Sequence, residues 1–398
     1  MATRRVESGR LELMQRGARL LPGNGEFWDR VGRYWQLDFS NPDSNQAVQN
    51  YLKAVHDDPN SAFYWMDLAS AYEDVGNIAQ ARAAFEKAES VYPISALVAW
   101  NYGNFLIRTG NYQEGYRKVR QAVLTDATLL PLAISRTWRA TDNVDDLLNE
   151  ALPANSEAYL QALKFFTSIQ RPDVGLQVWQ RLMALGKPAP IAETLAFQDS
   201  LIGADRAEDE LRVWRESVAA PGTTGGEPSA DSLIWNGDFV QDFTNGGLDW
   251  RWASPPGVSA SFDAAAPGQK GRSVRLDFEG GSNISLDQPA QYVPVAPGRR
   301  YHFHAWLRTE QITTESGMQF SIADPNHDGA VNFASDNFTG SHSWTAVDGD
   351  VTAAPKTHFL LVRLSRKLSR LFDNMISGTA WISGVSLVPS DAGDHKSP

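Results

Sequence analysis

The sequence predicts a multidomain protein that is α-helical in its first half and all-β in its second half. In the first half, large and small apolar residues recur at intervals of about 34 residues, which is typical of a solenoid of stacked helical hairpins. From residue 232 the apolar period changes from about 3.6 to about 2 and turn residues become frequent, which is typical of an antiparallel β-sandwich. Between the halves, residues 220–231 are rich in Pro, Gly, Ser and Thr and predict a linker. The predicted order is a solenoid over 1–219, this linker, a sandwich over 232–389, and a tail over 390–398.

The clearest helical unit covers residues 62–95. Its pattern consists of Trp65, Leu68, Ala69, Tyr72, Gly76, Ala81, Phe85, Ala88 and Pro93. The small Ala69 and Ala81 let two antiparallel helices approach, and Gly76 and Pro93 end them. This spacing resembles the tetratricopeptide repeat. One similar unit precedes it and another follows it, and weaker helical patterns after residue 128 predict divergent hairpins, with an irregular helical bundle as the alternative.

The tetratricopeptide resemblance implies a groove that binds a peptide or protein partner and is lined by the first helix of each unit. The corresponding positions are Glu26, Asp29, Arg33, Phe63, Met66, Ser70, Leu97, Trp100 and Asn104. Trp100 lies one place away from the usual packing position, so it is expected either to face the groove or to pack against the next unit. The groove lacks the lysine pattern that clamps a C-terminal carboxylate.

The second half begins with Asn236-Gly237-Asp238-Phe239, continues through Gly247 to Trp250, and ends with the strand at 381–387. These motifs resemble a carbohydrate-binding-module-like jelly roll of the galactose-binding-like superfamily. The resemblance covers 232–389 and implies a jelly-roll sandwich that binds a glycan. We expect Phe239 and either Trp250 or Trp252 to fill its core.

No cofactor is expected, with calcium as an open alternative at two places. Relatives hold calcium with acids where this chain has Val240 and Ser383–Gly384, so that site is not expected. In DPNHDG (324–329), Asp324, Asn326 and Asp328 match the start of a hand-type calcium loop, but Ser335 stands where a bidentate Glu is required. A tight polar hairpin loop explains the same residues.

Alternation along the predicted strands places a set of polar and aromatic residues on one sheet face. The set consists of Arg275, Asp277, His302, His304, Trp306, Arg308 and Arg363. Planar donors, a carboxylate and an indole on one face suit a sugar ligand. The alternatives are a solvated face held by ion pairs and a metal pair at His302 and His304. In the basic loop before the last strand, we expect Phe372 to be buried and Asp373–Asn374 to form a turn.

Composition and motifs exclude several function classes. The net charge is −11, and neither half is basic, so no nucleic-acid partner is expected. There is no cysteine, no apolar run long enough to span a membrane, and no signal peptide. No catalytic motif is visible. The absence of cysteine is compatible with the cytosol and with the periplasm or cell surface of a bacterium, and of these we favour the periplasm or cell surface. The chain opens in what resembles the second helix of a repeat, so we hypothesise a fragment whose anchor or signal lies upstream.

The sequence therefore predicts a non-catalytic protein that recruits a protein partner through the solenoid and binds an envelope glycan or exopolysaccharide through the sandwich. One alternative is a structural adaptor whose sandwich makes only protein contacts. Another is an accessory subunit of a sugar-acting enzyme.

Overall fold

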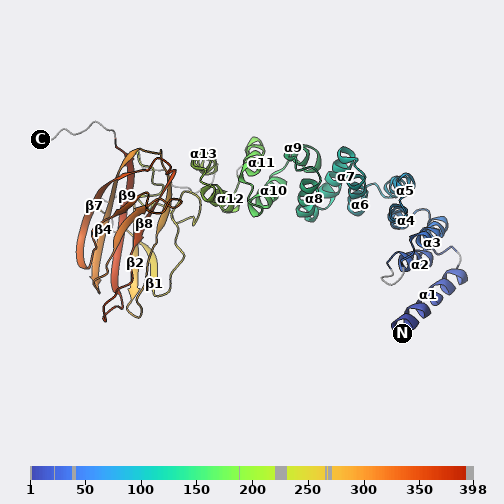
Figure 1. Cartoon of the computed structure of the whole chain (residues 1–398), viewed down its shortest axis with the longest axis horizontal. Coiled ribbons are helices and arrows are strands. Elements are labelled where there is room, and N and C mark those ends of the chain that lie inside the picture. Colours follow the sequence, from blue (N-terminus) through green and yellow to red (C-terminus); the bar gives the residue numbers. More distant parts are fainter. Residues whose placement is uncertain are drawn as a thin grey trace. The chain divides into compact units, whose positions relative to one another are not determined.

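The computed structural model describes residues 2–21, 23–37, 42–187, 189–219, 231–264, 267 and 271–390, without the side chains of residues 2–10 (Figure 1). The predicted linker lies outside these residues except for Asp231, and the predicted tail except for Ser390. The chain divides into two compact units, Met1–Phe165 and Phe166–Pro398. The second unit therefore holds the last helices together with both β-sheets. Among the described helices, none is both long and apolar enough to cross a bilayer.

The first unit is built from helical hairpins. Its helices are α1 (Ala2–Leu20), α2 (Gly25–Leu37), α3 (Ser44–Asp57), α4 (Ala62–Asp74), α5 (Ile78–Val91), α6 (Ala96–Arg108), α7 (Tyr112–Thr125), α8 (Leu130–Thr141), the short α9 (Val144–Asp146), and most of α10 (Ser156–Ser168). Three antiparallel pairs, α2 with α3, α4 with α5 and α6 with α7, match the three predicted units. The predicted solenoid of hairpins is confirmed here.

The α4–α5 hairpin forms for the reasons that its sequence indicates. Ala69 and Ala81 are fully buried, and Phe85 is 3% exposed between the helices. Gly76 takes a φ of 75° in the turn, a left-handed conformation that favours glycine. Asn77 then caps α5 by accepting a hydrogen bond from the backbone of Gln80.

The second unit begins with α11 (Pro172–Ala184), α12 (Ile191–Gly203) and α13 (Ala207–Val218), where the weaker pattern predicted divergent hairpins. Two antiparallel sheets follow. The five-stranded sheet has the order β1 (Val258–Asp263), β2 (Ser273–Glu279), β9 (Ser377–Pro389), β4 (Arg300–Ile312) and β7 (Gly340–Thr352). The four-stranded sheet has the order β3 (Ala290–Pro294), β8 (Phe359–Ser365), β5 (Gln319–Ala323) and β6 (Asn332–Ala334). The predicted α plus antiparallel β class is confirmed.

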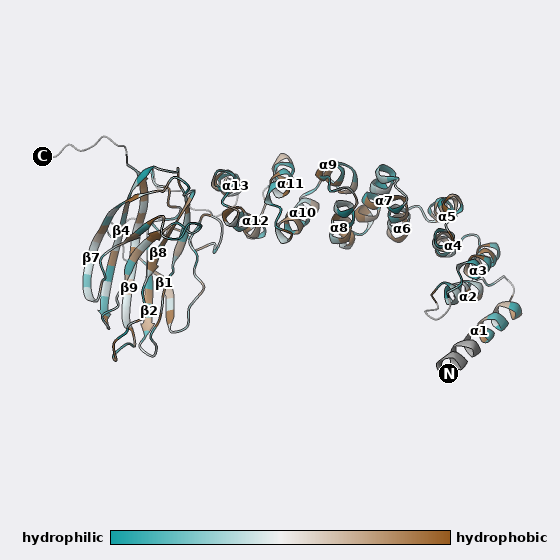
Figure 2. Ribbon diagram, in the orientation of Figure 1, coloured by the Kyte–Doolittle hydropathy of each residue, from teal (hydrophilic) through white to brown (hydrophobic). Residues whose placement is uncertain are grey.

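One apolar core fills the space between the two sheets. Phe303 on β4 and Phe320 on β5 meet there with ring centroids 5.2 Å apart. Phe239 and Trp250 are both fully buried, with ring centroids 5.4 Å apart, so the expected pair is Phe239 with Trp250 and not with Trp252. Hydrophilic residues, teal in Figure 2, are frequent along β4 and β7, whose outer side chains do not enter this core.

Helices α12 and α13 share a second core with the sandwich. Trp214 of α13 meets Trp235 edge to face with ring centroids 5.8 Å apart, and both lie in a cluster with Leu248. Asp199 of α12 accepts hydrogen bonds from the backbone of Gly247 at 2.9 Å and from Arg251 at 2.6 Å. The last helical pair is thus held to the sandwich by apolar contacts and a charged anchor.

The loop between β8 and β9 differs from its prediction. Phe372 is fully exposed, so the expectation that it is buried is wrong. The side chain that is buried in this region is Arg366, which is 1% exposed. Arg366 donates to the backbone oxygens of Ser316 and Ile284, and these bonds fasten the base of the loop while its tip stays in solvent.

Candidate functional site

The predicted groove residues divide into exposed and buried groups. Phe63 is 50% exposed and Leu97 is 48% exposed, so both are available to a partner. Met66, by contrast, is buried in the core of the helical unit, and Asp29 is 3% exposed. Burial and the nearby Asp67 raise the pKa of Asp29 to about 7. The prediction that Met66 lines the groove is therefore corrected, because its side chain is used for packing.

Neighbouring hairpins are joined by polar contacts between their first helices. Arg33 of α2 donates to Asp67 of α4 at 2.7 Å, and Gln36 of α2 donates to Ser70 of α4 at 3.0 Å. These pairs are separated by one repeat length of 34 residues. Side chains expected to contact a partner here are already bonded to the next unit.

A hollow of about 480 Å³ lies between α6 and α8, which we call the basic hollow. Its lining residues are Asn104, Ile107, Arg108, Leu132, Ser135, Arg136, Arg139 and Ala140. Three of the eight are arginines and none is acidic. Helical spacing produces this arrangement, because residues three, four, seven and eight positions apart share one face of α8.

The three arginines of the basic hollow differ in how far they are engaged. Arg108 forms a two-point ion pair with Glu73 at 2.7 and 2.8 Å. Arg136 donates to Asn104 at 3.1 Å. Arg139 makes no ion pair or side-chain hydrogen bond with any residue that the structure describes, so its guanidinium is free for a ligand.

Trp100 lies beside the basic hollow. Its half-buried ring is 5.7 Å from the guanidinium carbon of Arg136, which belongs to the following helix pair. Its position therefore combines the two alternatives, since it is partly exposed and also contacts the next unit. Asn104, a predicted groove residue, lines the basic hollow, although it is only 6% exposed.

The charge of the first helices changes sign along the unit. Asp67 and Asp74 of α4 stand one repeat, 34 residues, before Asn101 and Arg108 of α6. The equivalent positions are therefore acidic in α4 and neutral or basic in α6.

The sequence analysis did not single out Arg108, Arg136 or Arg139. Arg108 could have been found by comparing equivalent repeat positions, but the other two lie after residue 128, where the repeat pattern fades.

Six of the seven predicted sugar-binding residues share the outer face of the five-stranded sheet. Strand β2 supplies Arg275 and Asp277, and β4 supplies His302, His304, Trp306 and Arg308. Arg363 is the exception and is corrected here. It lies on β8 of the other sheet, where it donates to Ser321 at 3.0 Å.

Polar groups on this outer face are bonded to one another. The pairs are Arg275 with Asp277 at 2.8 Å, His302 with Asp350 at 3.2 Å, His304 with Asp348 at 2.7 Å, and Arg308 with Glu310 at 3.1 Å. The hydrogen bond from His304 lowers the pKa of Asp348. Both arginines also stand over Trp381 of β9, at 5.5 and 4.3 Å from its ring centroid. Most of this outer face is therefore arranged as a solvated sheet face held by ion pairs, which is the alternative to a sugar-binding face.

An open part of this face lies where β4 meets β7. A hollow of about 550 Å³ is lined by Arg308, Thr309, Glu310, Gln311, Ser341, His342, Ser343 and Trp344. The pairing of β4 with β7 is irregular here, with register shifts on both sides of Thr309. Trp344 was missed in the sequence, although the alternating run from Ser341 to Thr345 could have indicated a second aromatic residue on this face.

The predicted calcium loop is a hydrogen-bonded turn. Asp324 accepts from the backbones of Asn326 and His327 at 2.8 and 3.0 Å, and from the hydroxyl of Thr357 at 2.6 Å. Asn326 donates to Asp205 of the α12–α13 turn at 2.8 Å. The hydrogen bonds of Asp324 and Asn326 are of the kind that a tight polar hairpin loop makes. Within the described ranges, no three His, Cys, Asp or Glu side chains gather in a metal-ligating group.

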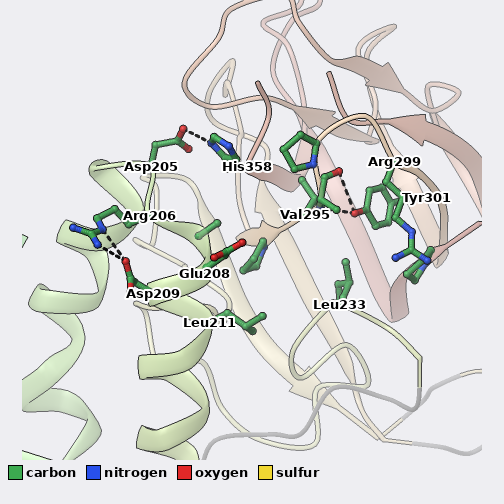
Figure 3. A pocket seen from close by; sticks show the side chains of 15 residues that line it. Asp205, Arg206, Glu208, Asp209, Leu211, Leu233, Val295, Arg299, Tyr301 and His358 are labelled. Atoms are coloured by element: carbon green, nitrogen blue, oxygen red, sulfur yellow. Dashed lines mark hydrogen bonds and ion pairs between the residues drawn. The ribbon is translucent and has the colours of Figure 1, made fainter. Parts of the chain in front are cut away.

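A further pocket of about 580 Å³ lies between α13 and the sandwich (Figure 3). Its apolar side chains include Leu211, Leu233 and Val295. At its rim, His358 bonds Asp205 at 2.7 Å, and Arg206 pairs with Asp209 at 2.6 Å. These two pairs join the α12–α13 turn to the residue before β8 and the turn to α13, so they help to fix α13 on the sandwich.

No protein-family model matches this sequence, and no curated protein matches it significantly. Similar solved structures include MamA, with 14% identity over 50% of this chain and 92% of that chain and a TM-score of 0.26. They also include PilF of Pseudomonas aeruginosa, with 18% identity over 50% and 78% of the two chains and a TM-score of 0.26. YrrB, described as a TPR protein with an unusual peptide-binding site, has 11% identity over 52% and 92% and a TM-score of 0.28.

Proposed function

We propose that this chain is a non-catalytic binding protein whose helical unit holds a segment of a partner protein. The observation that carries the proposal is the basic hollow between α6 and α8. It offers a free guanidinium at Arg139, the apolar side chains of Ile107 and the half-exposed Leu132, and the ring of Trp100 at its side. In a chain of net charge −11, a hollow with three arginines and no acid is a local reversal of charge. Such a hollow suits a segment that carries carboxylates next to apolar side chains.

Arg139→Ala is expected to weaken binding of an acidic peptide by about tenfold, the value of one charge-assisted contact. The measurement is fluorescence anisotropy on the full chain with three labelled peptides. They share the same apolar residues and carry Glu, Gln or Lys at the remaining positions. Wild-type protein should prefer the Glu peptide, and the preference should fall with added salt.

Arg117→Ala is the matched control. Arg117 lies on α7, is 67% exposed, and pairs with Glu150 away from the basic hollow. Its removal should leave binding within a factor of about two, because it removes the same charge from the chain without touching the hollow. Equal affinities for all three peptides, or equal losses in the two variants, would contradict the proposal.

We further propose that the β-sandwich holds a glycan on the outer face of its five-stranded sheet. The supporting observation is the hollow beside Trp344, where an indole stands among hydroxyl, amide and guanidinium groups. Sugar rings place C–H groups on aromatic faces and hydroxyls on such polar groups. The neighbouring Trp306 is half-buried because Gly384, with a φ of 58°, leaves room for its ring against β9.

Trp344→Ala is expected to lower affinity for a bound glycan by roughly tenfold, because it removes the stacking surface. A glycan array with the full chain identifies the sugar, and calorimetry then compares Trp344→Ala and Trp306→Ala with wild type. Phe63→Ala removes a 50% exposed aromatic ring from the helical unit and is the control. Absence of binding across the array by folded protein would favour the adaptor alternative, in which this face contacts only protein.

A further inference from the structure

The loop between β8 and β9 exposes an unusual number of apolar side chains. Leu368, Leu371 and Met375 are 54%, 58% and 55% exposed, and Phe372 is fully exposed; we call these four residues the apolar tip. Elsewhere in the described part of the chain after residue 230, Val240 is the one other large apolar side chain that is exposed. Single exposed apolar residues are ordinary, but a group on one loop marks an interaction surface.

The protein holds this loop in place from both ends. At its start, Asn283 donates to the backbone oxygen of Ser369 at 2.9 Å and accepts from its backbone N–H at 3.0 Å. At its end, Thr313 donates to the backbone oxygen of Met375 at 3.0 Å. With the buried Arg366 beneath, the apolar tip is displayed on a fixed backbone, so little order is lost when it binds.

Charges beside the apolar tip indicate what it meets. Lys367 and Arg370 make no ion pair with any carboxylate that the structure describes. The nearby carboxylate of Glu315 accepts from the hydroxyl of Ser369 and from the backbone of Arg370 instead. Asp373 is the one acidic residue in the loop between β8 and β9. Two free cations therefore lie in the same loop as the four exposed apolar side chains, next to Leu368 and Leu371.

We propose that the apolar tip inserts into the interface of an anionic lipid bilayer, with Lys367 and Arg370 contacting headgroup phosphates. A lipid interface presents phosphate groups and an apolar layer within a few ångströms of each other, which is the pairing that this loop requires. Long Lys and Arg side chains reach the phosphates while their neighbours sit deeper. This surface is separate from the basic hollow and from the Trp344 hollow, so it does not depend on the functions proposed above.

Vesicle flotation with the full chain tests the proposal. The vesicles contain phosphatidylcholine alone or phosphatidylcholine mixed with phosphatidylglycerol. Wild-type protein should float with the anionic vesicles, and the double variant Leu371→Ser with Phe372→Ser should lose about tenfold or more of its partitioning. Val240→Ser is the matched control, because Val240 is 66% exposed on the same sandwich, and it should float like wild type. Asp373→Asn removes the acid at the tip and should increase partitioning.

Three outcomes would overturn the proposal. One is absence of flotation with either vesicle, and another is equal flotation of the double variant and Val240→Ser. The third is a dimer in light scattering that only the double variant loses, because the tip would then join two copies of this chain. Circular dichroism of each variant confirms that lost binding is not lost folding.

Discussion

Replacing Gly247 with alanine is expected to lower the free energy of unfolding of the second unit by about 3 kcal/mol or more. Gly247 has a φ of 56°, which strains any residue with a Cβ atom. An alanine Cβ there would lie 2.5 Å from Oε1 of Gln198 and 2.6 Å from Cε3 of Trp214. Both neighbours are fully buried, so neither can move without disturbing the contact of α12 and α13 with the sandwich. Strain and overlap therefore act in the same direction.

Hydrogen exchange measures this effect where it should occur. The amides of α12 and α13 should lose protection in Gly247→Ala, while those of α4 and α5 in the first unit keep theirs. Gly203→Ala is the control, because a Cβ at that position, the end of α12, meets nothing within 4 Å. It should change stability by no more than about 0.5 kcal/mol. If Gly247→Ala kept full protection of α13, the described contact of these helices with the sandwich would be wrong.

The second large effect concerns Glu210 of α13. Its side chain is fully buried, and neither carboxylate oxygen has a hydrogen-bond partner in the described structure. Burial, with a smaller contribution from the charge of Asp199, raises the pKa of Glu210 well above its ordinary value of 4.5. In the unfolded chain the group ionises near that ordinary value, so the folded state binds the extra proton. The free energy of unfolding therefore falls as pH rises above about 4.5, until the folded-state pKa is passed.

Glu210→Gln should remove this pH dependence, because the amide carries no charge at any pH. At pH 8 it should raise the free energy of unfolding by about 2 kcal/mol or more, because the wild-type protein loses about 1.4 kcal/mol for each pKa unit by which burial raises the pKa of Glu210. Urea unfolding at pH 5 and pH 8, followed by exchange of the second unit's amides, gives the comparison. Glu208→Gln is the control on the exposed side of α13 and should follow wild type at both pH values. A variant no more stable than wild type at pH 8 would mean that water or an unseen partner satisfies Glu210.

Asp29, with a pKa raised to about 7 by burial, makes the free energy of unfolding of the first unit fall with rising pH as well.

Much of the local architecture could be predicted because it depends on periodicity. The alternation in β4 correctly separates the buried Tyr301, Phe303 and Leu307 from the outward Trp306 and Arg308. The hairpin of α4 and α5 follows from the positions of alanine and of Gly76. Such patterns are set by the geometry of one helix or one strand and need no knowledge of distant residues.

The candidate sites were only partly predictable, because each is assembled by distant segments. Trp100 and Asn104 were recognised from the repeat, whereas Arg136 and Arg139 come from a helix whose repeat pattern is weak. Arg363 has the same outward alternation as Arg308 but lies on the other sheet. Alternation gives the side of a strand and not the sheet to which the strand belongs.

The sequence alone therefore determined the helical hairpins, the change to strands, and the inner and outer sides of β2 and β4, since each depends on neighbours within a few residues. Tertiary structure decided which strands share a sheet, why Phe372 is exposed while Arg366 is buried, and how Gly247 lets α12 and α13 pack on the sandwich. These features depend on long-range pairing and on close packing between segments, which a local period does not encode.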